Sequence, residues 1–325
     1  MKSISKKFWK NKKILITGFE GFLGSWLTKT LVELGASTIG IDKVMNRPRS
    51  VLEGHRNRVI PIKGDICNLN LVRKTIDKYK PSIIFHLAAE AIVGQANNNP
   101  IRTFKSNIQG TWNILEASRG KGFICSIVVA SSDKAYGSTD NLPYREDTSP
   151  LKGDHPYDVS KSCADLLCNA YYNTYKVPIC VTRCGNIYGP GDYNFSRIIP
   201  ESIRCALEGK TLLIRSNGKF IRDYVYVGDI VEGYIILAEK SQKLKLAGEA
   251  FNFSDENPIS VLALVKKIYK LTRRDEKYEI LNTAKCEIPH QYSSSRKARK
   301  VLHWYPKVSL DEGLNRTISW YKQIF

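Results

Sequence analysis

No run of apolar residues approaches the roughly 18 that a membrane-spanning helix needs. The Lys-rich start, residues 1–13, has no apolar stretch followed by small residues, so it lacks the pattern of a secretory signal. No cysteine belongs to a Cys-x-x-Cys pair, and no histidine lies at zinc-finger spacing. We therefore expect no membrane span, no metal and a reducing, cytoplasmic location. The eight cysteines are Cys67, Cys125, Cys163, Cys168, Cys180, Cys184, Cys205 and Cys286.

Acidic residues are also scarce: 31 face 50 basic residues, which gives a formal net charge of +19. An excess of this size raises the possibility of nucleic-acid binding. The lysines are spread along the chain and form no single block, which favours a solvated basic surface. A positive field would also attract a diphosphate substrate. We expect such a substrate and no nucleic acid.

Short apolar runs alternate with amphipathic stretches of helical length in the first half of the 325 residues. This alternation predicts an α/β fold, a doubly wound parallel sheet with helices on both faces. The pattern becomes mixed after about Pro190. We predict one domain over 1–185 and a smaller mixed α/β region over 186–325, interleaved with the last strands of the sheet. Strands are expected at 13–17, 38–42, 59–62, 82–86, 124–131, 179–183, 211–214, 223–227 and 250–253. Helices are expected at 22–34, 69–78, 101–119, 157–175, 197–207, 229–238, 260–271 and 310–323.

Three glycines, Gly18, Gly21 and Gly24, lie between the first expected strand and the first expected helix. Glycine permits the tight turn and the close backbone approach that a diphosphate at a helix N-terminus requires. A glycine triplet alone is weak evidence, but this one has the strand before it and the amphipathic helix after it. The pattern predicts a Rossmann-type dinucleotide site.

Asp42 ends the second expected strand. A carboxylate there accepts both hydroxyl groups of the adenosine ribose, which favours NAD. The alternative is NADP, because Lys43, Arg47 and Arg49 follow closely and are suited to a 2′-phosphate. Asp65, after the third strand, is expected near the adenine; its alternative role is that of a turn residue.

Tyr157 and Lys161 are spaced by one helical turn, so the phenol and the ammonium lie on one helix face. Because a tyrosine titrates near 10, it accepts a proton at neutral pH only if its anion is stabilised, as a nearby ammonium does. Ser132, Asp133 and Lys134 follow the fifth strand, whose carboxyl end faces the ligand crevice. The alternative for Asp133 and Lys134 is an exposed ion pair on a loop.

With these motifs in place, the chain resembles an extended short-chain dehydrogenase/reductase over nearly its whole length. Sugar 4-epimerases usually carry a small residue at the position of Asp133, so the acid there resembles the nucleotide-sugar 4,6-dehydratases. Among these, an acid followed by a lysine, as in Asp133-Lys134, is most similar to the CDP-glucose 4,6-dehydratases. The Ile221-Arg-Asp-Tyr224 segment has the general dehydratase and epimerase form. The motifs that carry the resemblance are Phe8-Trp9, Gly18 to Ser25-Trp-Leu27, His86-Leu-Ala-Ala89, Asn107, Ser131-Ser132, Tyr157 with Lys161, Arg183-Cys-Gly-Asn-Ile-Tyr-Gly-Pro190, Arg222 to Asp229, Trp304-Tyr-Pro and Leu310-Asp-Glu-Gly313.

The resemblance implies an NAD-dependent enzyme that forms a 4-keto-6-deoxy sugar from a nucleotide-diphosphate hexose. Tyr157 then takes the 4-hydroxyl proton, Ser132 binds the 4-oxygen, and Asp133 protonates the departing 6-hydroxyl. Lys134 is either the base at C5 or a charged group that stabilises the enolate. Further implied cofactor residues are Phe19, Phe22, Leu23, Ile66, Leu87, Ala88, Ala89 and Asn107. Implied substrate residues are Asn186, Arg197 and Arg222, although Arg197 also fits a solvated helix start.

Two other functions stay open at this point. A nucleotide-sugar 4-epimerase uses the same cofactor and tyrosine. A non-catalytic dinucleotide-binding regulator needs neither Tyr157 nor Lys161, so the intact pair argues against it. The resemblance also implies a homodimer or higher homo-oligomer, paired through the helices expected at 101–119 and 157–175.

Overall fold

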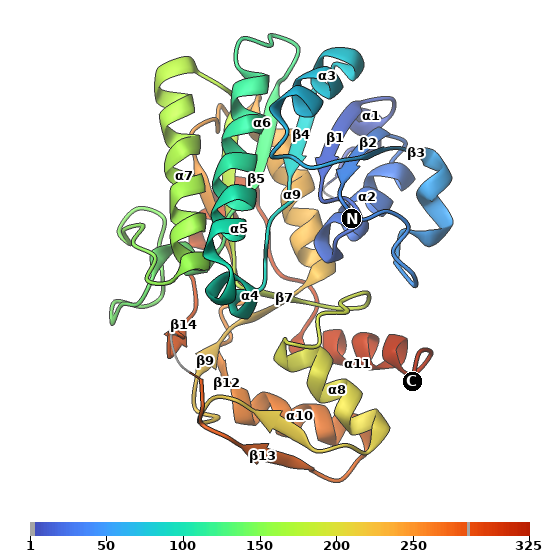
Figure 1. The fold of residues 1–325 in the computed structure, drawn as a ribbon, viewed down its shortest axis with the longest axis vertical. Coiled ribbons are helices and arrows are strands. Elements are labelled where there is room, and N and C mark those ends of the chain that lie inside the picture. The colour runs from blue at the N-terminus through green and yellow to red at the C-terminus, as the bar shows by residue number, and fades with distance from the viewer. Residues whose placement is uncertain (1–3, 285–286) are drawn as a thin grey trace.

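The main sheet of the computed structural model has seven strands, all parallel (Figure 1). The structure describes residues 4–284 and 287–325. The strands are β1 (Lys13–Thr17), β2 (Ser37–Asp42), β3 (Val59–Lys63), β4 (Ile83–His86), β5 (Ser126–Ala130), β6 (Ile179–Cys184) and β11 (Ala250–Phe253). They lie in the order β11-β6-β5-β4-β1-β2-β3, so the strand order reverses beside β1. In a doubly wound sheet, a dinucleotide binds at this switch point.

Side chains alternate between the two faces of this sheet. Ile14 and Ile16 of β1 enter one hydrophobic core, whereas Leu15 enters the other. In β4, Phe85 and Ile84 divide in the same way. Because the central strands are buried on both faces, their sequences are almost continuous apolar runs, which is why these strands could be located in the sequence.

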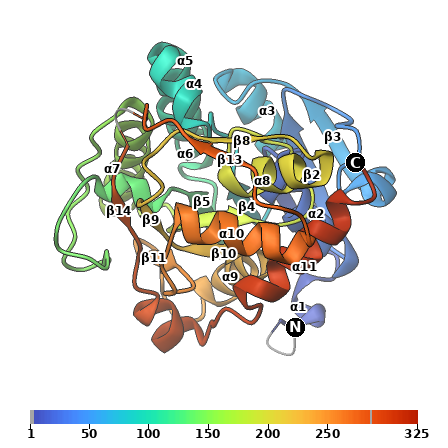
Figure 2. The ribbon, with the colours of Figure 1, turned by 90° about the horizontal axis from the view of Figure 1, so that it is seen from below.

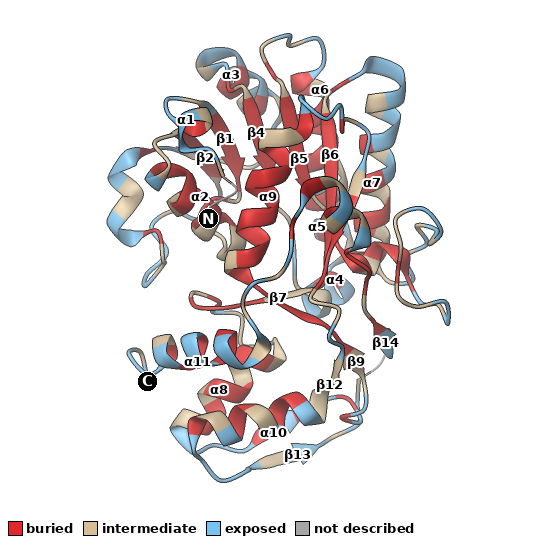
Figure 3. Cartoon of the chain, turned by 180° about the vertical axis from the view of Figure 1, so that it is seen from behind, coloured by how far each residue is buried: buried red, intermediate tan, exposed pale blue. Residues whose placement is uncertain are grey.

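Helices cover both faces of the sheet, as Figures 1 and 3 show from opposite sides. On one face lie α3 (Leu69–Tyr79), α6 (Gly110–Ser118) and α7 (Pro156–Tyr175), whose apolar side chains share one core. On the other lie α2 (Phe22–Glu33) and α9 (Val227–Ser241). The predicted fold class is therefore confirmed. Shorter elements around the sheet are α1 (Lys6–Trp9), η1 (Glu53–Arg58), α4 (Val93–Asn98), α5 (Pro100–Phe104), η2 (Lys105–Gln109), η3 (Asp133–Tyr136) and η4 (Ala298–Leu302).

A second group of elements lies below the sheet in Figure 1 and faces the viewer in Figure 2. Its helices are α8 (Ile198–Glu208), α10 (Val261–Thr272) and α11 (Leu310–Tyr321). Its small sheets are β10-β7, β12-β9-β14 and β13-β8. Their strands are β7 (Asn186–Tyr188), β8 (Leu212–Ile214), β9 (Ile221–Arg222), β10 (Tyr224–Tyr226), β12 (Ile259–Ser260), β13 (Tyr278–Ile280) and β14 (His290–Gln291). Leu212, Val265 and Tyr269 belong to a core of its own.

The helix expected over 101–119 is present, but it is not a regular α-helix throughout. The segment consists of α5, the π-helical turn η2 and α6. The wider turn contains Asn107, whose side chain binds the backbone of Glu90. Composition and periodicity do not reveal this change, because it preserves the apolar face of the segment.

Two late elements return to the main sheet. The strand β11 pairs with β6, and α9 packs beside α2 and over β5. The boundary between 185 and 186 stays a prediction. The cysteines within the described residues are free thiols, and Cys286 lies outside them. In the described ranges, no helix combines the length and the apolar character needed to cross a membrane.

Candidate active site

The loop after β1 needs glycine at two positions. Gly18 has a φ of +72°, and a Cβ there would lie 2.9 Å from the backbone of Ala88. A Cβ on Gly24 would lie 1.9 Å from the carbonyl oxygen of Gly18. Gly21 precedes α2 and offers no side-chain cap, so the first N–H groups of the helix are open to an anion. These features fit the diphosphate of a dinucleotide.

Bulky side chains of the same loop pack inward. Phe19 is buried beneath β2, where a Cβ on Gly40 would meet its ring at 2.4 Å. Phe22 and Leu23 are half-buried against the core. Their packing fixes the path of the loop, so a bound diphosphate would meet mainly its backbone.

The stretch after β4 is tied to β1 through one hydroxyl group. Thr17 Oγ1 accepts hydrogen bonds of 3.2 Å from the backbone N–H groups of both Leu87 and Ala88. Ala89 follows them and is half-buried. All three predicted residues therefore line the edge where the glycine loop lies, because Ala88 is also the residue closest to Gly18.

Asp42 stands at the end of β2, where the ribose of an adenosine is expected. Its carboxylate accepts hydrogen bonds of 3.1 Å from the N–H groups of Glu20 and Val44. Burial raises the pKa of Asp42, and these N–H groups oppose that shift. The neighbouring Glu20 is buried and forms a two-point ion pair with Arg56 at 3.0 and 3.1 Å. Two carboxylates thus face this corner of the site, which disfavours the additional phosphate of NADP.

Asp65 and Ile66 have structural partners. Asp65 accepts a hydrogen bond from the N–H of Cys67 at 2.9 Å and pairs with Lys43 at 3.1 Å, as a turn residue does. Ile66 is buried in the core against α6, and its carbonyl group accepts from Asn113 at 2.9 Å. Their predicted contacts to adenine stay predictions.

Asn107 uses its whole side chain within the protein. Its amide oxygen accepts from the N–H of Glu90 at 2.8 Å. Its amide nitrogen donates to the carbonyl of Glu90 at 3.1 Å and to the hydroxyl of Ser160 at 2.9 Å. Asn107 thus joins the loop after β4 to α7, and a contribution to cofactor binding would act through that loop.

Tyr157 and Lys161 lie one turn apart at the start of α7, with the Lys161 Nζ 5.9 Å from the centre of the Tyr157 ring. Burial raises the pKa of Tyr157 to about 12, while the Arg197 charge and the Ser132 hydroxyl act in the opposite direction. Burial also lowers the pKa of Lys161 to about 8, and its ammonium donates to the Ala130 carbonyl at 2.7 Å. The cation that most lowers the pKa of Tyr157 is Arg197, not the expected Lys161.

Asp133 is buried and Lys134 is half-buried, so the alternative of an exposed ion pair is wrong. Asp133 is 3% exposed and accepts a hydrogen bond from the Ser132 hydroxyl at 3.0 Å. Burial raises the pKa of Asp133, and the charges of Lys134 and Arg222 oppose the shift. Burial, followed by the Arg222 charge, lowers the pKa of Lys134. Both shifts favour the neutral forms, an acid able to donate and an amine able to accept a proton.

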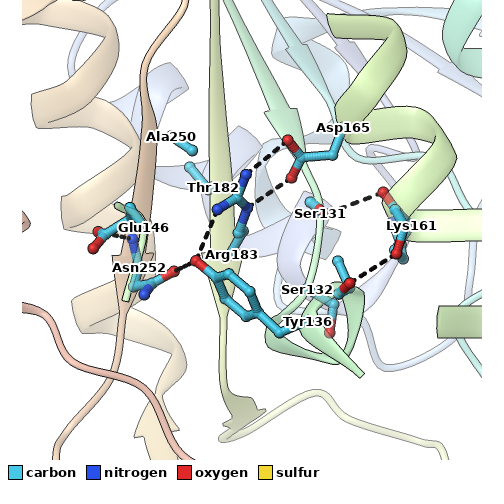
Figure 4. A network of polar contacts seen from close by, with 12 residues as sticks. Ser131, Ser132, Tyr136, Glu146, Lys161, Asp165, Thr182, Arg183, Ala250 and Asn252 are labelled. Carbon is cyan, nitrogen blue, oxygen red and sulfur yellow. Dashed lines mark hydrogen bonds and ion pairs between the residues drawn. The ribbon is translucent and has the colours of Figure 1, made fainter. Parts of the chain in front are cut away.

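A buried polar network supports the helix η3 that carries this pair (Figure 4). Arg183 binds Asp165 through two bonds and donates to the Tyr136 hydroxyl at 2.8 Å. Tyr136 donates to Asn252 at 2.8 Å, and the N–H of Asn252 donates to Glu146 at 2.7 Å. Strands β6 and β11, helix α7 and η3 are therefore locked together behind Asp133.

The predicted substrate residues lie in or next to β7, α8 and β9 of the second group of elements. Asn186 donates to the carbonyl of Asp223 at 3.2 Å. Arg197 precedes α8 and pairs with Asp192 at 2.9 Å, while staying 37% exposed. Arg222 is buried and donates to two backbone carbonyl groups at 2.8 and 2.9 Å. The charge of Arg222 lowers the pKa of Asp133, and the charge of Arg197 lowers the pKa of Tyr157. Both arginines therefore belong to the same site as Asp133 and Tyr157.

Two residues at this site were missed from the sequence. Gln291 accepts a hydrogen bond from the Lys134 Nζ at 3.1 Å and is fully buried. Asp223 is also fully buried, binds the Ser254 hydroxyl, and has a pKa raised to about 7 by burial and then by Asp133. A buried glutamine in a two-residue strand leaves no periodic signal. The Arg-Asp-Tyr motif around Asp223 was the only available hint.

The comparison with known families agrees with this geometry. The family model described as GDP-mannose 4,6 dehydratase matches residues 15–317. The chain belongs to this family. It is an NAD-dependent enzyme within the group of nucleotide-sugar 4,6-dehydratases and epimerases.

Three relatives illustrate the range of that family. The chain is 31% identical to the CDP-glucose 4,6-dehydratase of Salmonella typhimurium, over 98% of this chain and 93% of that one. It is 30% identical to the UDP-glucuronate 4-epimerase of Thermodesulfobacterium geofontis, over 95% and 96%. A dTDP-glucose 4,6-dehydratase from Streptomyces venezuelae, solved with NAD bound, superposes with a TM-score of 0.88 at 27% identity, covering 96% and 97%.

The family's cofactor fits the residues described above. A Cβ at Gly18 would collide with the backbone of Ala88, so the tight glycine loop that a diphosphate requires depends on this glycine, and Asp42 offers a carboxylate to the ribose. For metals, the described residues include no group of three or more His, Cys, Asp and Glu side chains placed to hold an ion.

Proposed function

We propose that the enzyme is a 4,6-dehydratase of a nucleoside-diphosphate hexose, with CDP-glucose as the preferred candidate substrate. The observation that carries the proposal is the pair formed by the buried Asp133 and the half-buried Lys134 beside Tyr157. An epimerase needs only a proton acceptor at the 4-hydroxyl. A dehydratase also needs an acid and a base for C6 and C5, and burial shifts the pKa of each member of this pair toward the neutral form that these roles require.

The glycine loop and Asp42 would hold NAD, which would supply a reversible hydride acceptor for the oxidation at C4 and the later reduction at C6. Tyr157 accepts the 4-hydroxyl proton, helped by the positive charges of Arg197 and Lys161. Ser132, which already lies against Tyr157 and Asp133, is placed to bind the 4-oxygen. The resulting ketone acidifies C5, and the neutral amine of Lys134 removes that proton. Asp133 donates its proton to the departing 6-hydroxyl, and water leaves. The Lys134 ammonium then returns its proton to C5 as C6 is reduced.

The epimerase reading is the second candidate, because a 4-epimerase matches the chain at 30% identity, close to the 31% of the dehydratase. One experiment separates the two. The native enzyme is incubated with CDP-, dTDP-, GDP- and UDP-hexoses, and the products are examined by mass spectrometry and by near-ultraviolet absorbance in alkali. Loss of one water together with an alkali-induced absorbance supports the dehydratase. A product of unchanged mass and inverted C4 contradicts it.

We further propose a homodimer paired through α5, α6 and α7. The support is a set of exposed apolar side chains on these helices, namely Ile101, Trp112 and Leu166 at 68%, 42% and 54% exposure. The substitution Leu166→Arg would introduce a charge at that interface, and Leu213→Arg, on exposed β8, is the matched control. The proposal is supported if light scattering shows that the native protein and Leu213→Arg are dimers and that Leu166→Arg is a monomer. A monomeric native protein contradicts it. A cytoplasmic location and the absence of nucleic-acid binding remain part of the proposal.

A further inference from the structure

Gln291 connects the second group of elements to the predicted acid and base. It lies on β14, is 0% exposed, and accepts a hydrogen bond of 3.1 Å from the Lys134 Nζ across a separation of 157 residues. Its amide nitrogen is buried without a hydrogen-bond partner, and so is the Oδ2 atom of Asp133. The amide is nevertheless close enough to Asp133 to act on its titration as a hydrogen-bond donor. One side chain therefore reaches both members of the pair.

We propose that Gln291 is a positioning residue for the dehydration step, holding the Lys134 amine with its oxygen and the Asp133 carboxyl group with its nitrogen. This inference rests on the proposed function. A neutral amine has two N–H groups and one lone pair. When one N–H is given to Gln291, the orientation of the lone pair is restricted, so the amine is preorganised to accept a proton from C5.

The uncharged amide is essential to this role. The charged groups that act on Lys134 are Arg222 from β9, Asp158 from α7, Asp133 from η3 and Glu287 from the segment before β14. Arg222 disfavours the ammonium form, and the three carboxyl groups favour it. A carboxylate in place of Gln291 would add a further negative charge in direct contact with the amine, which would then stay an ammonium and could not act as the base.

Strand pairing links Gln291 to the substrate end of the site. Gln291 is opposite Arg222 in the parallel pairing of β14 with β9. Arg222 also donates to the carbonyl of Pro289 at 2.9 Å, which ties the strand carrying Gln291 to the arginine. A substrate diphosphate that engages Arg222 would therefore fix the strand from which Gln291 reaches Lys134.

The test compares Gln291→Glu, Gln291→Met and the native enzyme, with Gln323→Glu at an exposed position as the charge control. The Cε carbon of Lys134 is followed by NMR as pH changes, and its signal is assigned by its loss in Lys134→Met. We expect the midpoint to rise by at least about one pH unit in Gln291→Glu, because a new carboxylate contacts the amine. Gln323→Glu should leave it unchanged. An unaltered midpoint in Gln291→Glu overturns the inference, whatever substrate the enzyme proves to use.

Kinetics supply the second readout. With a substrate that the native enzyme dehydrates, Gln291→Glu should still form NADH transiently, while turnover falls at least about tenfold. The pH at which turnover reaches half of its maximum should also be higher in Gln291→Glu than in the native enzyme. Gln291→Met should lose turnover without that shift in pH. Equal loss of NADH formation and turnover in both variants would indicate a merely structural role and overturn the inference. If the native enzyme produces no 4-keto-6-deoxy sugar, the proposed function fails, and the NMR midpoint still decides whether Gln291 controls Lys134.

Discussion

Arg183 and Asp165 form a two-point ion pair in the interior, with N–O distances of 2.7 and 2.9 Å, and the same guanidinium holds the hydroxyl of Tyr136. The two side chains are 7% and 6% exposed. Tyr136 ends the short helix that begins with Asp133. The position of the predicted acid therefore depends on an ion pair formed between β6 and α7.

Asp165→Asn should destabilise the protein by about 3–5 kcal/mol, because it leaves the charge of Arg183 buried without its counter-charge. Urea unfolding followed by circular dichroism measures the loss. Glu312→Gln, which breaks the exposed pair with Arg316, is the control and should cost at most about 1 kcal/mol. Equal losses in the two variants would show that the buried pair has no special role.

Tyr157→Phe should abolish the first chemical step. Without the phenol no group accepts the 4-hydroxyl proton, so no transient NADH absorbance should appear and turnover should fall by about 10²–10⁴-fold. Tyr171→Phe, toward the other end of the same helix, removes a hydrogen bond to Glu116 and should leave both unchanged. Formation of NADH at the native rate by Tyr157→Phe would assign the proton to another residue.

Asp133→Asn and Lys134→Ala should stop the reaction one step later. Each variant keeps Tyr157 and should therefore reduce NAD transiently, while product formation falls by about 10²–10⁴-fold. Lys134→Ala should also slow exchange of the C5 hydrogen with deuterated solvent. Full turnover in both variants would reject the dehydratase and leave the 4-epimerase.

Asp42→Ala should weaken NAD binding by more than about tenfold, because it removes a charged acceptor for the ribose hydroxyls. Calorimetric titration of the cofactor-free enzyme with NAD measures this change. Asp140→Ala, an exposed carboxylate remote from β2, should bind NAD as the native enzyme does. Unchanged affinity in Asp42→Ala would place the ribose elsewhere.

His86 should make folding stability fall in acid. The imidazole lies between Thr17 and Thr111 at 2.8 and 3.1 Å, and burial lowers its pKa to about 3. The unfolded chain binds this proton below about pH 6.5, whereas the folded chain does not until about pH 3, so stability declines as pH falls between those values. The free energy of unfolding, measured in urea, should fall between about pH 7.5 and about pH 5.5 by about 1 kcal/mol more in the native protein than in His86→Asn.

The sequence predicted the features that are local in the chain. The glycine loop, Asp42 at the end of β2, and the turn spacing of Tyr157 and Lys161 follow from short segments with strong patterns. The central strands were found because burial on both faces makes their sequences almost continuously apolar. These elements sufficed to predict the fold and the cofactor.

The environment of Asp133 and Lys134 could not be predicted in the same way. Gln291 lies 157 residues from Lys134 in the sequence, and the charge of Asp133 raises the pKa of Asp223. Such contacts depend on how the two groups of elements meet, and the strand that brings Gln291 to the site has only two residues. The sequence therefore identified the reactive side chains but not the groups that set their protonation.

The late return of β11 to the main sheet also determines when the protein can complete its fold during synthesis. Until Ala250–Phe253 has left the ribosome, β6 is an unprotected sheet edge, and such edges pair readily with other chains. Asn252, the partner of Tyr136, arrives at the same moment. The nascent chain must therefore carry an unfinished nucleotide-binding half while the residues between β6 and β11 are synthesised, with the risk of aggregation concentrated at that one edge.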